Sequence, residues 1–153
     1  MMVFRVIVLV GLLILLVSSI VPWISINLPI LGRSNYNLFD IFSLTFNYIS
    51  STGKQVISSL SMFLIILTVI SYIVSIMTTA IGVFIKGFCI VGGVLAILSG
   101  TSFITGMIIA KSEVRIVRFL EQFLTGLINI EIGSILTIIG GILILIAYTI
   151  RER

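Results

Sequence analysis

The chain has 153 residues, of which 59% are hydrophobic and only 9% charged, and it contains no histidine. A soluble domain carries about 25% charged residues, and a short soluble chain cannot bury this much apolar surface. Lipid is therefore expected to cover much of the surface, as in an integral membrane protein. The net charge of +4 is spread along the chain without a Lys/Arg run, so we expect no nucleic-acid partner.

The first apolar segment runs from about residue 5 to 21, carries no charge after Arg5, and is long enough to cross a bilayer. It also resembles a secretory signal, because a basic start and an apolar stretch lead to two small residues, Ser18 and Ser19, near a possible cleavage point. The apolar run continues past these serines, which favours an uncleaved helix. Trp23 is placed as a membrane-interface anchor, and packing beneath an extramembrane cap is the alternative for its ring.

The first connection, about residues 22–57, is the most polar part of the chain. The stretch WISINLPI alternates apolar and polar residues, which predicts a strand. We expect a turn over Gly32–Asn35 and a return strand over Tyr36–Phe39. Asp40 is expected to be the N-cap of a partly amphipathic segment at the membrane surface. Together these predict an ordered outer cap.

Three further apolar segments follow, over about residues 58–81, 87–110 and 132–150, and each is long enough to span a bilayer. Lys86 is the one charged residue between the first two, which predicts a tight connection there.

The second long connection, about residues 111–131, is amphipathic over its first part. It is expected to extend the third helix or to lie on the membrane surface. Its charged side presents Arg115, Arg118 and Glu121. These form either a partner-binding face or a solvated helix side with an ion pair that contributes a few tenths of a kcal/mol.

The chain is thus expected to be an all-α integral membrane protein with a single domain over residues 1–153. The predicted fold is a four-helix transmembrane bundle with a small β-containing extramembrane first loop and an amphipathic extension after the third helix. Both termini then share one side of the membrane. Lys and Arg are divided almost evenly between the two sides and do not decide the orientation. The larger connections favour cytoplasmic termini for a multi-pass protein of the cell membrane.

No Asp, Glu, Lys, Arg or His lies in the middle of an apolar segment. Ionisable residues inside a membrane mark proton relays, ion paths and substrate sites, and hydrolysis needs an activated nucleophile or a metal. Cys89 is the sole cysteine, so no intrachain disulfide forms. We therefore expect no enzyme activity, no metal site and no cofactor.

Small residues recur at helical spacing within the apolar segments, and such residues let helix backbones approach closely in lipid. They form either a self-association face or the packing contacts of a single bundle. In the third segment they are Gly92, Ala96, Gly100, Ser102, Gly106 and Ala110, in the fourth Gly133, Thr137 and Gly141, and in the second Thr68, Ser71, Ser75 and Thr79. We expect the four hydroxyl side chains of the second segment either to line a pore or to donate to carbonyls of their own helix.

The order of these elements resembles the group of four-helix membrane proteins that includes the claudins and peripheral myelin protein. Trp23 stands early in the first loop, the third segment is rich in glycine, and Glu131 and Gly133 precede an apolar run with a glycine pair. The first loop is shorter than that of claudins and lacks their cysteine pair. The resemblance therefore implies the fold and a general role in association between membrane proteins, rather than junction strands.

The leading hypothesis is a non-enzymatic membrane protein that acts through helix packing and its outer loops, in a claudin-like association or scaffold role. The first alternative is a small accessory subunit of a larger membrane complex. The second is a homo-oligomeric channel. The expected partners are the lipid bilayer and either copies of the same chain or other membrane proteins.

Overall fold

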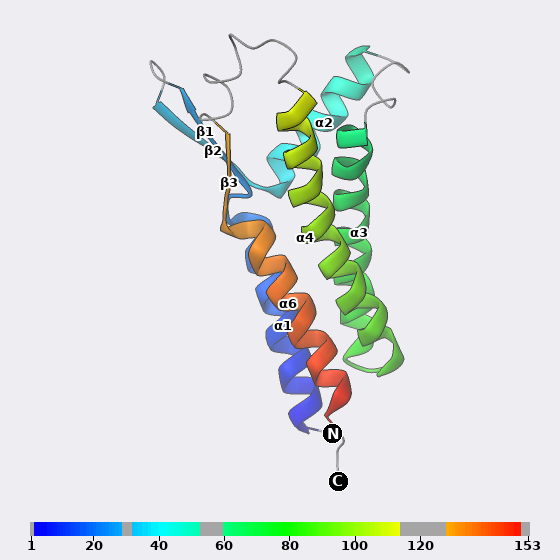
Figure 1. Ribbon diagram of the computed structural model, residues 1–153. Helices are drawn as coiled ribbons and strands as arrows, with labels where there is room; N and C mark the ends of the chain where they lie inside the picture. Colours follow the sequence, from blue (N-terminus) through cyan, green and yellow to red (C-terminus); the bar gives the residue numbers. More distant parts are fainter. Residues whose placement is uncertain (1, 29–31, 53–59, 114–127, 151–153) are drawn as a thin grey trace.

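The computed structural model describes residues 2–28, 32–52, 60–113 and 128–150. Helices dominate, and a small sheet lies at one end (Figure 1). The elements are α1 (Met2–Ile20), β1 (Ile24–Leu28), β2 (Gly32–Tyr36), α2 (Leu38–Thr52), α3 (Leu60–Gly82), α4 (Gly87–Glu113), β3 (Ile128–Ile130) and α6 (Ile132–Thr149).

Four of these helices, α1, α3, α4 and α6, are long and apolar enough to cross a membrane. Their bounds agree with the four predicted helix ranges to within three residues, so this part of the sequence prediction is confirmed. The start of α1, the end of α6 and the α3–α4 turn lie at one end of the bundle, and the sheet and α2 lie at the other (Figure 1).

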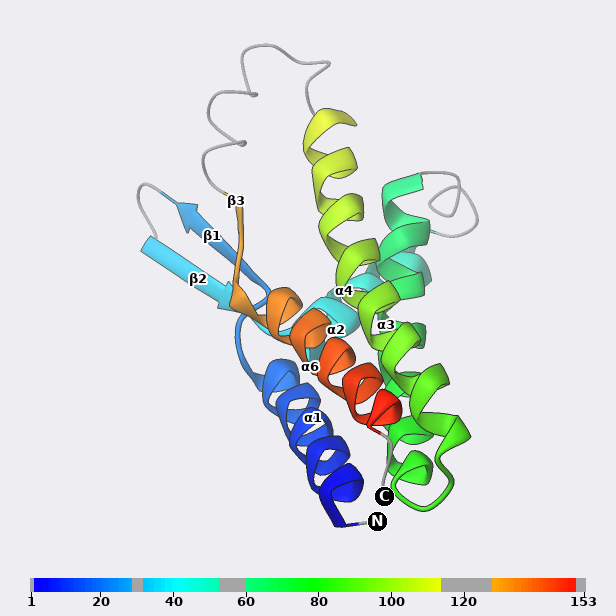
Figure 2. The same cartoon turned by 60° about the horizontal axis from the view of Figure 1, so that its bottom comes forward.

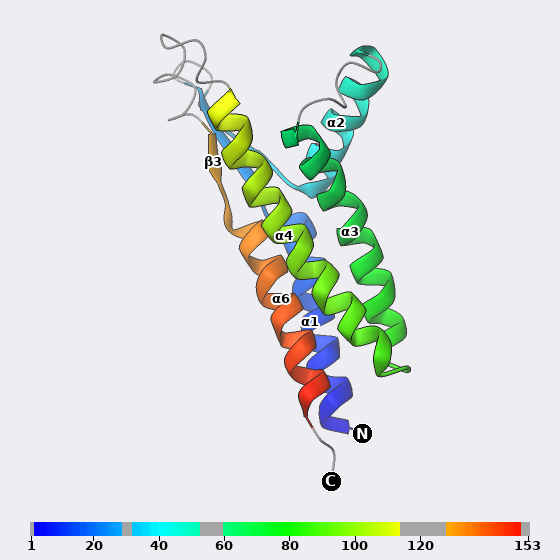
Figure 3. The same cartoon turned by 45° about the vertical axis from the view of Figure 1, so that its right-hand side comes forward.

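The long helices pack as a row rather than as a closed square. α1 packs along α6, α6 along α4, and α4 along α3, whereas α1 and α3 touch much less. Figures 2 and 3 show the α1–α6 pair beside the α3–α4 pair, and α2 contacts both α1 and α3.

Two consecutive glycines of α6 make its close contacts with both neighbours. A Cβ atom on Gly140 would lie 3.2 Å from the carbonyl oxygen of Gly11 in α1, and one on Gly141 would lie 2.8 Å from that of Gly93 in α4. Small residues let helices approach closely where lipid supplies no hydrophobic drive for association. The glycine pair therefore sets the spacing of the row.

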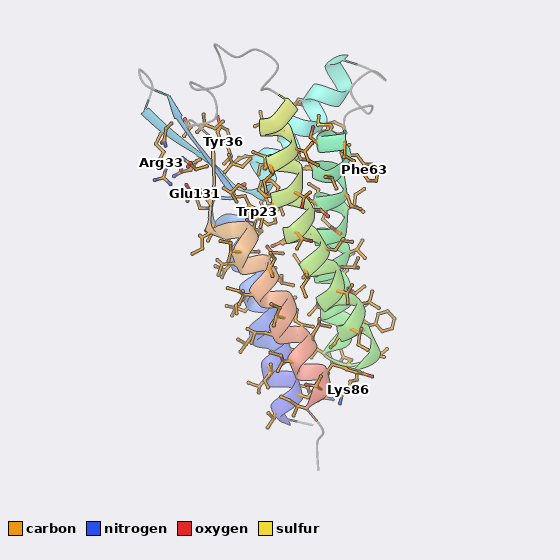
Figure 4. All side chains as sticks on the ribbon, viewed as in Figure 1. Trp23, Arg33, Tyr36, Phe63, Lys86 and Glu131 are labelled. Carbon is orange, nitrogen blue, oxygen red and sulfur yellow. The ribbon has the colours of Figure 1, made fainter. Side chains whose placement is uncertain are left out.

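The turn between α3 and α4 is fastened to the ends of the terminal helices. Lys86 Nζ lies 5.3 Å from the ring centroid of Phe4 and 5.4 Å from that of Tyr148, and it donates to the carbonyl of Ile150 at 3.4 Å. A cation over aromatic rings is stabilised by their quadrupoles. This exposed residue thus joins both helix pairs at the end away from the sheet (Figure 4).

The sheet has three antiparallel strands in the order β2-β1-β3. The predicted turn over Gly32–Asn35 is wrong, because these residues form β2 and pair with β1. The predicted return strand over Tyr36–Phe39 is also misplaced, since only Tyr36 belongs to β2 and α2 begins at Leu38. The last part of the predicted loop 111–131 is β3, which the sequence analysis did not anticipate.

The start of α2 differs from the prediction by three residues. Asn37 is the cap: its side-chain Oδ1 accepts from the Asp40 backbone N–H, and Asp40 Oδ2 accepts from the Asn37 N–H, both at 3.0 Å. This reciprocal arrangement is a capping box. Asp40 is therefore its third-position partner and lies inside the helix, not at its N-cap.

We predict that Gly141→Ala destabilises the bundle, because the added methyl meets a backbone oxygen that cannot move without shifting α4. The expected loss is about 1–3 kcal/mol, the usual range for overpacking, measured as thermal unfolding in lipid nanodiscs. Gly87→Ala is the matched control, since nothing lies within 4 Å of its Cβ position. Equal melting temperatures for the two variants would contradict this spacing role.

Candidate functional site

Trp23 lies at the centre of the contacts between the sheet and the helices. Its side chain is fully buried, and its ring makes edge-to-face contacts with Tyr72 of α3, at 5.8 Å between centroids, and with Phe103 of α4, at 4.9 Å. Such aromatic pairs contribute about 0.5–1.5 kcal/mol beyond area burial. The ring therefore packs beneath the cap, as the alternative for Trp23 expected, while its role as a membrane-interface anchor stays a prediction (Figure 4).

The polar groups around Trp23 satisfy one another inside the bundle. Trp23 Nε1 donates to the Ser18 carbonyl at 2.6 Å, and the Tyr72 hydroxyl donates to the Leu15 carbonyl. Ser18 Oγ lies 3.1 Å from the Tyr72 hydroxyl and accepts from Thr137 Oγ1 at 3.0 Å. Side chains of α1, α3 and α6 thus meet in one hydrogen-bonded cluster, which we call the Trp23 cluster.

The backbone around Trp23 connects the three strands to the start of α6. Trp23 N–H donates to the Tyr36 carbonyl, and its own carbonyl accepts from the Glu131 N–H, both at 2.9 Å. A Cβ atom on Gly133 would lie 2.2 Å from Trp23 Cδ1. Gly133 is therefore required for the indole to lie against the first turn of α6.

A charged group reinforces the same junction from the solvent side. Arg33 of β2 forms a salt bridge with Glu131, and the buried Ser25 hydroxyl of β1 donates to the same carboxylate. The Arg33 side chain is 55% exposed, so the ion pair itself contributes about 1 kcal/mol at most. Its role is to hold the register of β2 and β1 against α6 (Figure 4).

Most of the predicted packing residues lie in contacts within the chain. The hydroxyl stripe of α3 is buried and faces α4: Ser75 Oγ donates to the Gly92 carbonyl at 2.8 Å, and Ser99 of α4 donates back to the Thr68 carbonyl at 3.0 Å. Ser71 bonds the Leu67 carbonyl of its own helix. Thr79 Oγ1 has no hydrogen-bond partner within the described residues and lies against Gly92.

The remaining small residues follow the same pattern. Gly100 faces the Ser134 carbonyl of α6, and Gly106 faces Leu64 of α3. Ala96, Ser102 and Thr137 are buried, and Ala110 is half-buried. These contacts are those expected of packing within one bundle. The predicted partner face of Arg115, Arg118 and Glu121 lies outside the described residues.

An apolar groove lies between α1 and α3, two long helices that contact each other much less than the neighbouring helices of the row do. Residues of α2 close the groove at the sheet end of the bundle. Its volume is about 310 Å³. We call it the α1–α3 groove, and its principal lining residues are Leu16, Ser19, Leu38, Phe42, Ile73 and Met77.

Within residues 2–28, 32–52, 60–113 and 128–150, no three His, Cys, Asp or Glu side chains come together as metal ligands. The hydroxyls of the Trp23 cluster are bonded to helix carbonyls or to each other. Sequence reasoning missed Tyr72 and Ser18 as its members, although both are polar residues within apolar segments.

Comparison of the chain with protein-family models, with curated proteins and with solved structures finds no match.

We predict that Tyr72→Phe lowers the stability of the bundle by about 1 kcal/mol, the usual contribution of an interhelical hydrogen bond in a membrane. The change removes the hydroxyl bonded to Leu15 and leaves the ring contact with Trp23 in place. Unfolding in nanodiscs, followed by Trp23 emission, measures the loss. Tyr148→Phe is the control, because the Tyr148 ring lies near Lys86 at the far end. A Tyr72→Phe variant as stable as this control would show that the Tyr72 hydroxyl contributes nothing to stability.

Proposed function

We propose that the chain is a non-enzymatic, multi-pass membrane protein whose function is association with other copies of itself or with other membrane proteins. Its placement in a bilayer is supported by the outward faces of the long helices. On α1, Val6, Leu13 and Ile20 are exposed, and on α6 Ile135 and Ile142 are exposed. Contiguous exposed apolar surface of this kind needs lipid or a partner to cover it.

The observation that supports association most directly is the exposed aromatic ridge of α2. Phe39, Phe42 and Phe46 recur at helical spacing, and 64%, 48% and 62% of their respective side-chain surfaces are exposed. The rings of Phe42 and Phe46 lie 6.2 Å apart. Aromatic residues are enriched at protein interfaces because they bury large areas at low entropic cost.

The helix that carries the ridge is anchored in the core, which favours specific binding over non-specific hydrophobic association. Leu38 and Ile41 of α2 are buried in the same apolar core as Trp23. The capping box fixes the first turn of the helix. A partner would therefore meet a ridge whose position is already set, and preorganisation of this kind lowers the entropy lost on binding.

The hypothesis that the chain is claudin-like is part of this proposal. It is supported by the order of the elements, with strands after the first helix, a tight turn between the second and third long helices, and the shared side of the two ends. It implies cytoplasmic termini, with the sheet and α2 on the outer side of the cell membrane.

We predict that Phe46→Ala weakens association while leaving the fold intact, because surface substitutions change stability by about 0.5 kcal/mol or less. Native mass spectrometry of the protein extracted from its own membrane into nanodiscs measures the assembly. Phe84→Ala is the control, since Phe84 is 81% exposed and lies in the α3–α4 turn at the opposite end.

We expect wild type to give a series of oligomers of the same chain. Phe46→Ala should reduce the number of copies per oligomer, and Phe84→Ala should leave that number unchanged. A fixed stoichiometry with other membrane proteins would favour the accessory-subunit alternative instead. A wild-type protein that is monomeric and without partners in native lipid would overturn the proposal.

A further inference from the structure

The α1–α3 groove is an apolar space between two long helices that contact each other less than the neighbouring helices of the row do. It is continuous with faces that the proposed membrane placement exposes to lipid: Leu16 of α1, Ile73 of α3 and Met77 of α3 are 49%, 51% and 63% exposed. Phe39 and Phe42 of α2 lie across its upper end. An occupant therefore enters from the lipid side and stops beneath α2.

The groove offers no free hydrogen-bond donor to an occupant. Its two hydroxyl-bearing lining residues are Ser19 and Tyr72. Ser19 Oγ donates to the Leu16 carbonyl of its own helix at 2.7 Å, and the Tyr72 hydroxyl donates to the Leu15 carbonyl. Both hydroxyl protons are used within the chain and the other lining residues are apolar, so the occupant is apolar along the length that lies in the groove.

The lining also differs from the contacts that hold helices together in this chain. The close helix contacts described above use glycine, as at Gly11 with Gly140 and Gly93 with Gly141. The described groove lining contains neither glycine nor alanine. Helix association in lipid relies on small residues and interhelical hydrogen bonds. The lining has one small residue, Ser19, and the hydroxyl protons of Ser19 and Tyr72 are already used within the chain, so the walls suit a thin flexible chain better than a helix.

The size of the groove agrees with this conclusion. Its volume of about 310 Å³ is roughly twice that of an engineered apolar cavity of about 150 Å³ that binds benzene. A helix with its side chains is about 10–12 Å wide and would not enter such a space. We propose that the groove binds the acyl chain of a membrane lipid from the leaflet on the sheet side. This inference rests on the proposed membrane placement. The groove shares Phe39 and Phe42 with the α2 ridge, so the test below is chosen to separate lipid binding from association.

Trp23 is the sole tryptophan and reports on the groove through Tyr72, whose ring lines the groove and contacts the indole. The test compares Trp23 emission in vesicles of phosphatidylcholine with that in vesicles of the same lipid brominated in its acyl chains. Bromine quenches tryptophan at short range. We expect lower emission in the brominated vesicles, although the indole itself is fully buried.

Ser19→Leu fills the groove and is expected to abolish most of this loss of emission. Thr101→Leu is the matched control, because Thr101 is an exposed helix hydroxyl bonded to its own Ile97 carbonyl. If Ser19→Leu fails to fold, Leu16→Phe is the second filling variant, with Leu13→Phe as its control on the outward face of α1.

Equal emission in the two vesicle types, or equal quenching of wild type and the filling variant, would overturn the proposal. If a second copy of the chain fills the groove, bromination has no effect and Ser19→Leu instead changes the number of subunits seen by native mass spectrometry. That outcome would contradict lipid binding while leaving the association role in place. Conversely, a monomeric protein that shows the expected quenching retains the lipid site and loses the association role.

Discussion

The burial of Trp23 between the two helix pairs is the constraint on which the rest of the structure depends. Its indole fills the space between Tyr72 of α3 and Phe103 of α4, and its backbone pairs with both β2 and the entry to α6. Because a buried indole N–H needs an acceptor, the Ser18 carbonyl at the end of α1 has to lie beneath it. One residue thereby fixes the sheet, the end of α1 and the start of α6 relative to the α3–α4 pair.

The polar residues of the apolar helices follow from the same constraint. In an apolar interior an unpaired hydroxyl is costly, so Ser18, Ser75, Ser99 and Thr137 turn toward helix carbonyls or toward each other, whereas the Thr79 hydroxyl has no partner within the described residues. The small residues allow close helix packing: Gly140 lies against α1 and Gly141 against α4, so α6 contacts two neighbouring helices. With these residues used internally, many bulky apolar side chains face outward, and the α2 ridge and the α1–α3 groove are the surfaces that we propose for partners and for lipid.

The four helices could be predicted because each requires only a long apolar run, and α3 and α4 are separated by a charge beside glycines. The sheet could not be placed correctly. Gly32–Asn35 has the composition of a turn, yet pairing with β1 makes it a strand, and β3 has only three residues, too few for an alternating pattern to appear. Trp23 follows the first helix where interfacial anchors are common, and its burial depends on Tyr72, Phe103 and Gly133, which are distant in sequence. The groove likewise depends on which helices pack next to each other, and local sequence patterns do not predict helix neighbours.

The most direct test of the account is the accessibility of Trp23 in the folded protein. Its emission would be recorded in lipid nanodiscs while iodide and acrylamide are added to the aqueous phase. A fully buried indole between Tyr72 and Phe103 predicts blue-shifted emission that both quenchers leave almost unchanged until the protein is unfolded. Ready quenching of the folded protein by iodide would place Trp23 at the membrane–water interface, and it would contradict the arrangement of sheet and helices described for this chain.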